Sequence, residues 1–422
     1  MSASSTRPSY AAVLRMPHAT RTFTAALVGR LSYGMVSLAV LLAVSRATGS
    51  YAAAGAVMAL FGAASVFLSP LRAALVDRHG PRRALLPMAA LYAGLLGTLA
   101  AATWRPGAPA AVLGTVAVAA GACTPPLGPT MRAVWGELVT DRRLLQRAYS
   151  LDGVAEELLF VSGPLLVGVL VGFAPPAAGV AVSALLVGIG TLAFVTSPVV
   201  KNVAVRASRA RAHARTRIGR GLVQPVVVAA GVGLSLGAVD LLVLAFAEQR
   251  GHGDDTVAWI FAALSAGSAV GGLLYGAVEW RAGARVRLPA LTAGLGLSLA
   301  AAGLAPGFAT LTGAVVCAGF FVAPALTTAY LVADESAAPG ARVQAGAWVN
   351  TAVNAGISTG AAAGGLLVGH LPVGAGFALA GGAALLAAAA VGLGTRYPRA
   401  RPQKQKQKRD REQEAGSAEQ AR

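Results

Sequence analysis

The sequence has few charged residues, few aromatic residues and almost no cysteine. Asp, Glu, Lys and Arg together make up 12% of the 422 residues, about half the share that is usual in soluble domains. Aromatic residues make up 6%, and the two Cys and five His are too scattered for a disulfide framework or a metal site. These shortages exclude a soluble enzyme, a disulfide scaffold and a zinc centre, and no metal ligand set is expected.

What the chain has in excess is apolar residues. Hydrophobic residues make up 55% before its 52 glycines are added, whereas soluble domains have about 45–50% with glycine included. They form long uncharged blocks such as residues 107–131, and about 20 apolar residues span a bilayer as a helix. The first block is longer than a signal-peptide core, so we expect it to be retained. The sequence predicts an all-α integral membrane protein.

Charge clusters and Pro/Gly turns divide the chain into twelve predicted transmembrane helices. They cover residues 22–45, 51–71, 84–103, 108–131, 148–173, 176–199, 222–247, 256–278, 288–304, 308–333, 343–369 and 371–395. The termini and the alternate loops on their side carry 31 of the 35 Lys and Arg, and the opposite loops carry three, Arg46, Arg105 and Arg250. The positive-inside rule therefore predicts a cell-membrane protein with both termini in the cytoplasm.

The sequence splits into two halves of six helices. A loop with seven basic and no acidic residues, within 200–221, separates the predicted bundles 22–199 and 222–395. We interpret it as a tether that rests on anionic lipid headgroups. Residues 1–21 form a cytoplasmic segment, and the low-complexity charged tail 396–422 is predicted to be disordered. The net charge of +18 follows from topology, so no nucleic-acid partner is expected, and we expect a monomer.

The two halves also repeat each other. Leu31-Ser32-Tyr33-Gly34 matches Leu234-Ser235-Leu236-Gly237 at an offset of 203 residues. Gly121 and Pro126 match Gly319 and Pro324 at an offset of 198. Two parallel six-helix bundles related by a pseudo-two-fold axis, with substrate bound between them, are a transporter architecture.

The loop after the second predicted helix carries a recognisable motif. Asp77, Arg78, Gly80, Arg82 and Arg83 resemble motif A of the major facilitator superfamily, with Ala73 in place of the leading glycine and Pro81 in place of the first basic residue. The stretch 24–86 resembles poorly characterised actinobacterial members. The resemblance implies a gate that closes the cytoplasmic side. We expect Asp77 to contact the start of the eleventh helix near Arg342, and the three arginines to pair with acids.

Five ionisable residues fall inside predicted helices, where they are costly and usually functional. They are Arg30, Asp152, Glu156, Glu157 and Asp240. Arg30 and Glu156 share a depth of about 12 Å at 1.5 Å rise per residue. Asp152 and Glu156 share a helix face, while Glu157 is rotated by about 100°. We interpret Glu156, with or without Asp152, as a proton-coupling or cation-binding carboxylate balanced by Arg30. The alternative is a static bridge between helices one and five.

Other polar and small residues add candidates. Asn350 and Asn354 share one face of the eleventh helix and could bind substrate or bridge helices. Gly356, Gly360 and Gly364 form a four-residue ladder that predicts close helix packing. Gly163-Pro164 resembles part of the Gly-Pro signature of drug:proton antiporters, which favours export.

These features predict a secondary transporter. We expect proton-coupled export of a small amphipathic or cationic molecule by alternating access. No phosphate-loop motif is present, so the proton gradient is the expected energy source, without a cofactor. The alternatives are a sugar or metabolite permease and a membrane sensor with a transporter fold that does not transport.

Overall fold

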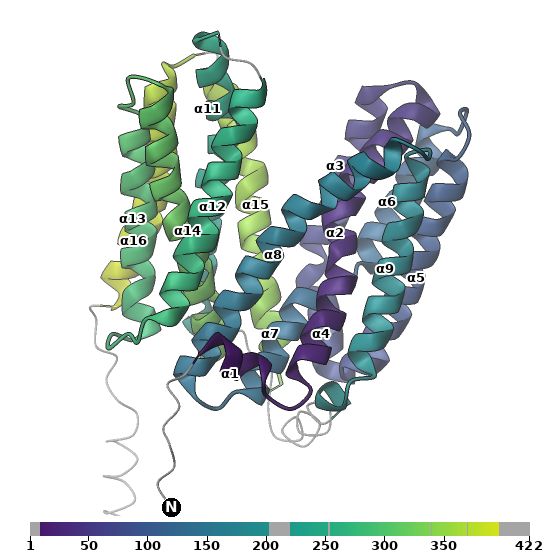
Figure 1. The fold of residues 1–422 in the computed structure, drawn as a ribbon, viewed down its shortest axis with the longest axis horizontal. Helices are drawn as coiled ribbons and strands as arrows, with labels where there is room; N and C mark the ends of the chain where they lie inside the picture. The colour runs from purple at the N-terminus through teal and green to yellow at the C-terminus, as the bar shows by residue number, and fades with distance from the viewer. Residues whose placement is uncertain (1–8, 202–219, 252–253, 339, 369, 396–422) are drawn as a thin grey trace, which may run out of the picture.

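A computed structural model describes residues 9–201, 220–251, 254–338, 340–368 and 370–395 (Figure 1). Most of the predicted basic linker 200–221 and all of the predicted disordered tail 396–422 lie outside the described residues. The N-terminal bundle contains the helices α1 (Tyr10–Leu14), α2 (Ala19–Thr48), α3 (Tyr51–Phe67), α4 (Ser69–His79), α5 (Pro81–Thr103), α6 (Ala110–Cys123), α7 (Leu127–Leu138), α8 (Arg142–Val171) and α9 (Ala177–Val195). The C-terminal bundle contains a short 3₁₀ turn (Arg220–Leu222) and α11 (Val223–Gln249), α12 (Asp254–Ala277), α13 (Ala284–Ala302), α14 (Phe308–Ser336), α15 (Arg342–Val368) and α16 (Val373–Thr395).

The described chain is helical throughout, and the predicted all-α membrane architecture is confirmed. Ten spans, with α6 and α7 joined as one, are long and apolar enough to cross a bilayer, and the bent pair α3/α4 makes an eleventh. The helix α13 is not among these spans, because Arg285 and Arg287 near its start lower its mean hydropathy. It packs within the C-terminal bundle. Every predicted helix range overlaps an observed helix or a pair of them.

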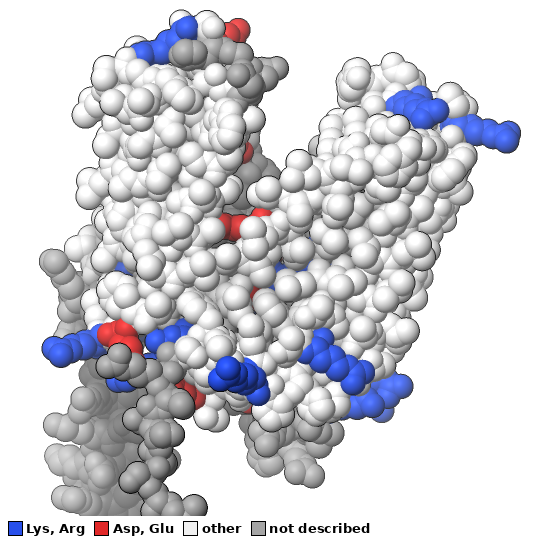
Figure 2. All heavy atoms as spheres, viewed as in Figure 1, with Lys and Arg blue, Asp and Glu red and all other residues white. Residues whose placement is uncertain are grey.

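The two bundles meet at one end and diverge at the other. Figure 1 shows α11 to α16 on the left and α2 to α9 on the right, with α1 crossing the end where the bundles meet. The space-filling view shows the two lobes parted at the top, and blue Lys and Arg side chains gathered around the joined end below (Figure 2). We call these the open end and the joined end.

The internal repeat appears in the helix packing. A Cβ on Gly34 of α2 would collide with the carbonyl oxygen of Leu159 in α8, and a Cβ on Gly237 of α11 would collide with that of Ile357 in α15. These positions correspond at the offsets of 203 and 198 residues. Both bundles therefore bring the same two helices into backbone contact where a side chain would not fit.

The two bundles differ where proline interrupts a helix. Pro324 lies inside the continuous α14, but the corresponding Pro126 follows Pro125 in the break between α6 and α7. Two consecutive prolines remove two backbone donors and crowd the preceding turn, so the helix stops. The predicted span 108–131 therefore corresponds to one span, Ala110–Leu138, which is interrupted between α6 and α7. The predicted span 51–71 is likewise two helices, bent by 41° between α3 and α4.

Candidate functional site

The break between α6 and α7 leaves backbone carbonyl groups without partners inside a helix, and side chains of the N-terminal bundle bind them. The Tyr33 hydroxyl donates to the carbonyl oxygen of Pro125 at 2.5 Å. Arg72 of α4 donates through Nη1 to the carbonyl oxygen of Gly121 at 2.6 Å and through Nη2 to that of Ser65 at 2.5 Å. The buried Arg72 guanidinium thus links the C-terminal ends of α3 and α6, where a cation is favourable against the helix dipoles.

Four charged side chains form a closed cluster behind this break. Arg30 Nη1 lies 2.7 Å from Asp152 Oδ1, and Arg30 Nη2 lies 3.1 Å from Glu156 Oε2. Arg132 Nε lies 2.9 Å from Asp152 Oδ2, and Arg132 also pairs with Glu156. Each acid therefore contacts both arginines, and the cluster is formally neutral.

The charge cluster is deeply buried apart from one member. The Asp152 side chain is fully buried, those of Arg30 and Arg132 are nearly so, and Glu156 is 27% exposed. Taking four charges out of water is costly unless each is paired, and the alternating contacts meet that condition. The face shared by Asp152 and Glu156 is the one that the spacing of four residues predicts.

Sequence reasoning missed Arg132. The fourth predicted helix ends at residue 131, so the sequence predicts a loop position for Arg132, whereas the structure places it inside α7. The sequence signal that could have located it is Pro125-Pro126, because a new helix that begins after these prolines would include Arg132. The guanidinium of Arg132 also lies 3.8 Å from the ring centroid of Tyr330 in α14. The cluster therefore reaches the C-terminal bundle.

One cavity of about 250 Å³ lies beside the cluster, between the bundles. Arg30, Arg72 and Glu156 line it from the N-terminal bundle, and Asn350 and Asn354 line it from α15. Its aromatic and other apolar lining residues include Tyr33, Met58, Phe61, Tyr92, Pro125 and Phe160. A space of this kind, mostly apolar with a few convergent polar groups, is typical of a small-molecule site.

The remaining predicted site residues lie elsewhere. Glu157 points away from the cavity, and its carboxylate accepts a hydrogen bond from the Ser268 hydroxyl of α12. Asp240 is exposed on α11 and does not line the cavity. Asn354, by contrast, lines the cavity, and it donates to the carbonyl oxygen of Asn350 at 2.8 Å, within its own helix.

The predicted small residues lie at helix contacts. A Cβ on Gly356 or Gly360 would collide with the backbone of α11, and one on Gly364 would lie 3.3 Å from Ala238 Cα. A Cβ on Gly163 would collide with the backbone of Gly34, and the neighbouring Pro164 lies inside α8 without ending it.

The joined end is held by contacts between the two bundles. Asp77 at the end of α4 accepts the backbone N–H of Val343 at 3.2 Å and that of Gln344 at 2.8 Å, in the first turn of α15. The neighbouring Arg342 lies 3.1 Å from Glu137 of α7 and 3.4 Å from Asp334 of α14. The helix end that Asp77 contacts is the one expected from the sequence.

The other motif residues are placed differently. Gly80 forms the turn between α4 and α5 with a φ of +85°, a backbone conformation that favours glycine. Arg78 lies in the last turn of α4. Arg82 and Arg83 are exposed at the start of α5. No described acid forms an ion pair with either of them, whereas Arg342 pairs with Glu137 and Asp334. The expected ion pairs of these two arginines are not found among the described residues, and their pairing stays a prediction.

A second set of contacts joins α8 to α12. Gln146 donates to the carbonyl oxygen of Tyr275 at 2.8 Å, and Arg147 donates to that of Ala277 at 3.0 Å. These side chains bind the free carbonyl groups at the C-terminal end of α12.

Among the residues that the structure describes, no group of three or more His, Cys, Asp or Glu could hold a metal ion.

Two six-helix bundles, joined at one end around a cavity that both of them line, define a multi-pass membrane transporter. The chain belongs to the Major Facilitator Superfamily, whose family model matches residues 22–239 and 226–420. Membership in this superfamily places the chain among transporters of small molecules, not among enzymes.

Solved structures share the fold. The human organic anion transporter MFSD10 (TETRAN) is 16% identical, with a TM-score of 0.70 over 91% of this chain and 100% of that one. A bacterial homologue of the iron transporter ferroportin, in an outward-facing state, is 14% identical, with a TM-score of 0.66 over 89% and 97%.

The proton:xylose symporter XylE, bound to 6-bromo-6-deoxy-D-glucose, is 14% identical, with a TM-score of 0.64 over 90% and 95%. No curated protein sequence matches the chain. The resemblance to the superfamily is confirmed, while the likeness to actinobacterial members and to drug antiporters stays a prediction.

Proposed function

We propose that this protein is a proton-coupled secondary transporter that exports a small amphipathic molecule across the cell membrane. The cavity between the bundles supports this proposal, because both bundles line it and a buried charge cluster forms part of its wall. Alternating access would open it first at one end and then at the other. With both termini in the cytoplasm, the joined end would face inward and the structure would be outward-facing.

The charges around the cavity favour a neutral or anionic substrate group over a cationic one. Asp152 and Glu156 are each held by two arginines, so neither offers a free negative charge. Arg72 has no acidic partner among the described residues and lines the cavity with Arg30. The hypothesis of a cationic substrate has Glu156 balanced by Arg30, so that a proton or a cation can replace Arg30. A second arginine, Arg132, also pairs with Glu156, and this weakens that hypothesis.

Glu157 is better placed than Glu156 to carry the coupling proton. It lies on α8 and accepts a hydrogen bond from Ser268 on α12, so it lies at the interface between the two bundles. No described cation forms an ion pair with it, and its Oε2 is buried without a partner. Gain or loss of a proton there would change the charge between the bundles, while the acids of the cluster would keep their arginines.

The test is substrate-evoked proton flux in proteoliposomes with an imposed pH gradient, using anionic, neutral and cationic amphipathic compounds. We expect flux with an anionic or neutral compound, its loss in Glu157→Gln, and an altered substrate affinity in Glu156→Gln. Glu248→Gln, an exposed acid at the end of α11, is the matched control. Unchanged proton flux in Glu157→Gln would show that another residue carries the coupling proton. No proton flux with any compound, in folded protein, would contradict the proposed transport.

A further inference from the structure

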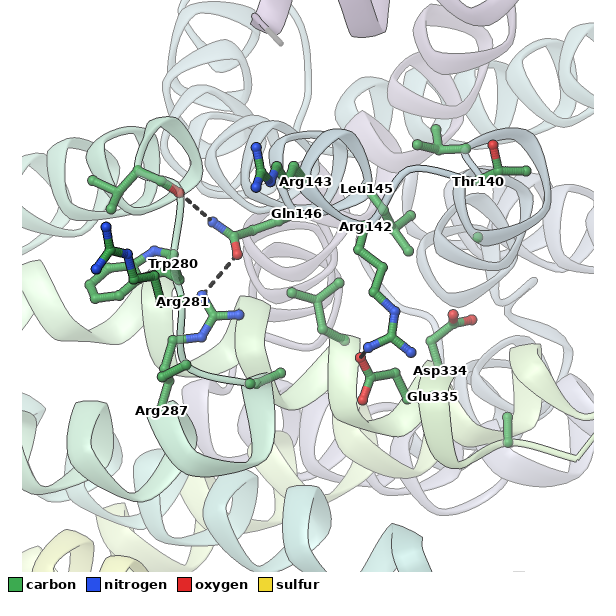
Figure 3. Close-up of a pocket in the computed structure, with 18 of the residues that line it drawn as sticks. Thr140, Arg142, Arg143, Leu145, Gln146, Trp280, Arg281, Arg287, Asp334 and Glu335 are labelled. Atoms are coloured by element: carbon green, nitrogen blue, oxygen red, sulfur yellow. Dashed lines mark hydrogen bonds and ion pairs between the residues drawn. The ribbon is translucent and has the colours of Figure 1, made fainter. Parts of the chain in front are cut away.

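A second pocket lies at the joined end, outside the cavity described above. It has a volume of about 620 Å³ and is lined by both bundles. The N-terminal bundle contributes the start of α8, with Arg142, Arg143 and Gln146. The C-terminal bundle contributes Arg281 in the turn between α12 and α13, Arg287 in the first turn of α13 (Figure 3), and the end of α14.

The pocket lining is strongly basic. Its arginines are Arg142, Arg143, Arg281, Arg287 and Arg342, and its acids are Asp334 and Glu335. The two acids are engaged by arginines, since Arg342 lies 3.4 Å from Asp334 and Arg142 lies 3.3 Å from Glu335. Arg143 is also engaged, since it lies 2.7 Å from Glu279 in the turn after α12. Arg281 and Arg287 form no ion pair with an acid of the described chain, so they are the two pocket arginines in this set whose charge no ion pair balances.

Arg287 is fixed in place with hydrogen-bonding capacity left over. Its Nη1 donates to Oε1 of Gln146 at 2.8 Å, and its guanidinium lies 5.2 Å and 5.4 Å from the ring centroids of Tyr275 and Trp280. Its Nε is buried without a hydrogen-bond partner. This N–H is closed to solvent, whereas the Arg287 side chain as a whole is only partly buried. An anion in the pocket would therefore bind the Nη groups of the guanidinium.

The geometry of this pocket also brings a helix N-terminus to the same place. Gly283 and Ala284 at the start of α13 line the pocket, and Gly283 has no side chain to cap the helix. Free backbone N–H groups and the helix dipole favour an anion there. Figure 3 shows Arg142 and Arg287 on opposite sides of the pocket, carried by opposite bundles.

We propose that this pocket binds a phosphate-bearing anion, the headgroup of an anionic lipid or a soluble phosphate compound. Several guanidinium groups around one space match the geometry of phosphate oxygens, and Trp280, Leu145 and Leu331 supply apolar surface for the rest of the ligand. Because each bundle supplies part of the site, the anion binds the conformation that is closed at the joined end. The pocket is a regulatory site that holds the transporter in that state.

The first test measures the unfolding temperature of the full chain in nanodiscs. One arm adds inorganic pyrophosphate to nanodiscs of neutral lipid, and the other replaces part of the lipid with phosphatidylglycerol. We expect a rise of about 2 °C or more in at least one arm, since ligand that binds only the native state stabilises it. A rise with pyrophosphate assigns a soluble ligand, and a rise with phosphatidylglycerol alone assigns a lipid. No rise in either arm overturns the proposal.

Variants separate the pocket from the general basic surface. Arg281→Gln removes a pocket charge that no described acid balances, and we expect about a tenfold loss of pyrophosphate affinity or the loss of the lipid effect. Arg281→Lys keeps the charge and retains part of the response. The control Lys201→Gln removes an exposed charge outside the pocket. An Arg281→Gln response equal to those of the wild type and of Lys201→Gln overturns the proposal.

The conformational consequence is read at the open end. Spin labels at Tyr51→Cys and Leu304→Cys, positions 80% and 85% exposed, are placed in a chain with Cys123→Ser and Cys317→Ser. Added anion is expected to increase the population with the longer distance between labels. An unchanged distance distribution while the anion is bound overturns the regulatory role.

Discussion

The carboxylate of Asp77 accepts the backbone N–H of Gln344 at 2.8 Å and so caps a helix that belongs to the other bundle. The acceptor lies at the end of α4 and the donor in the first turn of α15. An N-terminal cap is normally supplied by the residue before the helix. Here the cap can form only while the two bundles are joined at this end. It therefore stabilises one conformation of the transporter relative to the other.

Asp77→Asn is expected to reduce the population that is closed at the joined end. The substitution removes the charge that interacts with the dipole of α15, which is worth about 0.3–2 kcal/mol. The conformational equilibrium should therefore shift by about 2- to 30-fold. Distances between spin labels at Tyr51→Cys and Leu304→Cys would report the shift as a larger population with the bundles close at the open end.

The matched control for this prediction is Asp141→Asn. Asp141 caps its own helix, α8, by accepting the backbone N–H of Arg143 at 2.9 Å. Loss of its charge should leave the distance distribution unchanged, because both groups lie in one bundle. Equal distributions for Asp77→Asn and the wild type would show that the cap between the bundles does not bias the equilibrium.

The helices were predictable from the sequence because hydropathy is a local signal. Twelve apolar ranges were sufficient to place the spans, and the i, i+4 spacing of Asp152 and Glu156 placed both acids on one face. The breaks were not predicted, although Ser69-Pro70 and Pro125-Pro126 lie beside them. Missing the second break also hid Arg132, since its burial depends on a helix that restarts at Leu127.

Contacts between the bundles could not be predicted in the same way. The hydrogen bond from Ser268 to Glu157 joins residues 111 positions apart, and no local pattern encodes which face of α8 meets α12. Sequence reasoning did locate the partner helix of Asp77, through the resemblance to motif A. It did not predict that Arg342 would pair with Glu137 and Asp334.

Gly360→Ala should destabilise the C-terminal bundle. A Cβ at this position would collide with the backbone of Leu234 in α11, and overpacking of this kind costs about 1–3 kcal/mol. The unfolding temperature of the purified protein would report the loss. Gly188→Ala is the control, because a Cβ there meets nothing within 4 Å. Equal unfolding temperatures for the two variants would contradict close packing of α11 and α15.

Tyr10→Phe should weaken the attachment of α1 to the C-terminal bundle. The Tyr10 hydroxyl donates to the carbonyl oxygen of Leu273 in α12 at 2.5 Å, and loss of such a bond costs about 0.5–1.5 kcal/mol. Burial raises the pKa of Tyr10 to about 12, although the charge of Arg147 opposes the shift. The neutral hydroxyl is therefore the donor below pH 10, and its contribution is lost as the pH rises through 12.

The difference in unfolding temperature between the wild type and Tyr10→Phe should thus be constant from pH 6 to pH 9. Tyr51→Phe provides the comparison, since Tyr51 is 80% exposed and the substitution should change little. A difference for Tyr10→Phe that disappears between pH 6 and pH 9 would contradict the assigned pKa and the donor role of the hydroxyl.

Arg132→Met should be the most damaging of these substitutions, because it leaves Asp152 and Glu156 to share Arg30. Removing one partner of a buried ion pair costs about 3–5 kcal/mol, since the remaining charge stays buried without compensation. The double variant Arg132→Met/Asp152→Asn keeps the Arg30–Glu156 pair and restores neutrality, so it should recover part of the lost unfolding temperature. Arg142→Met removes the exposed bridge to Glu335 and should cost less than about 1 kcal/mol. An unfolding temperature for Arg132→Met no lower than that of Arg142→Met would mean that the four charges do not act as one buried unit.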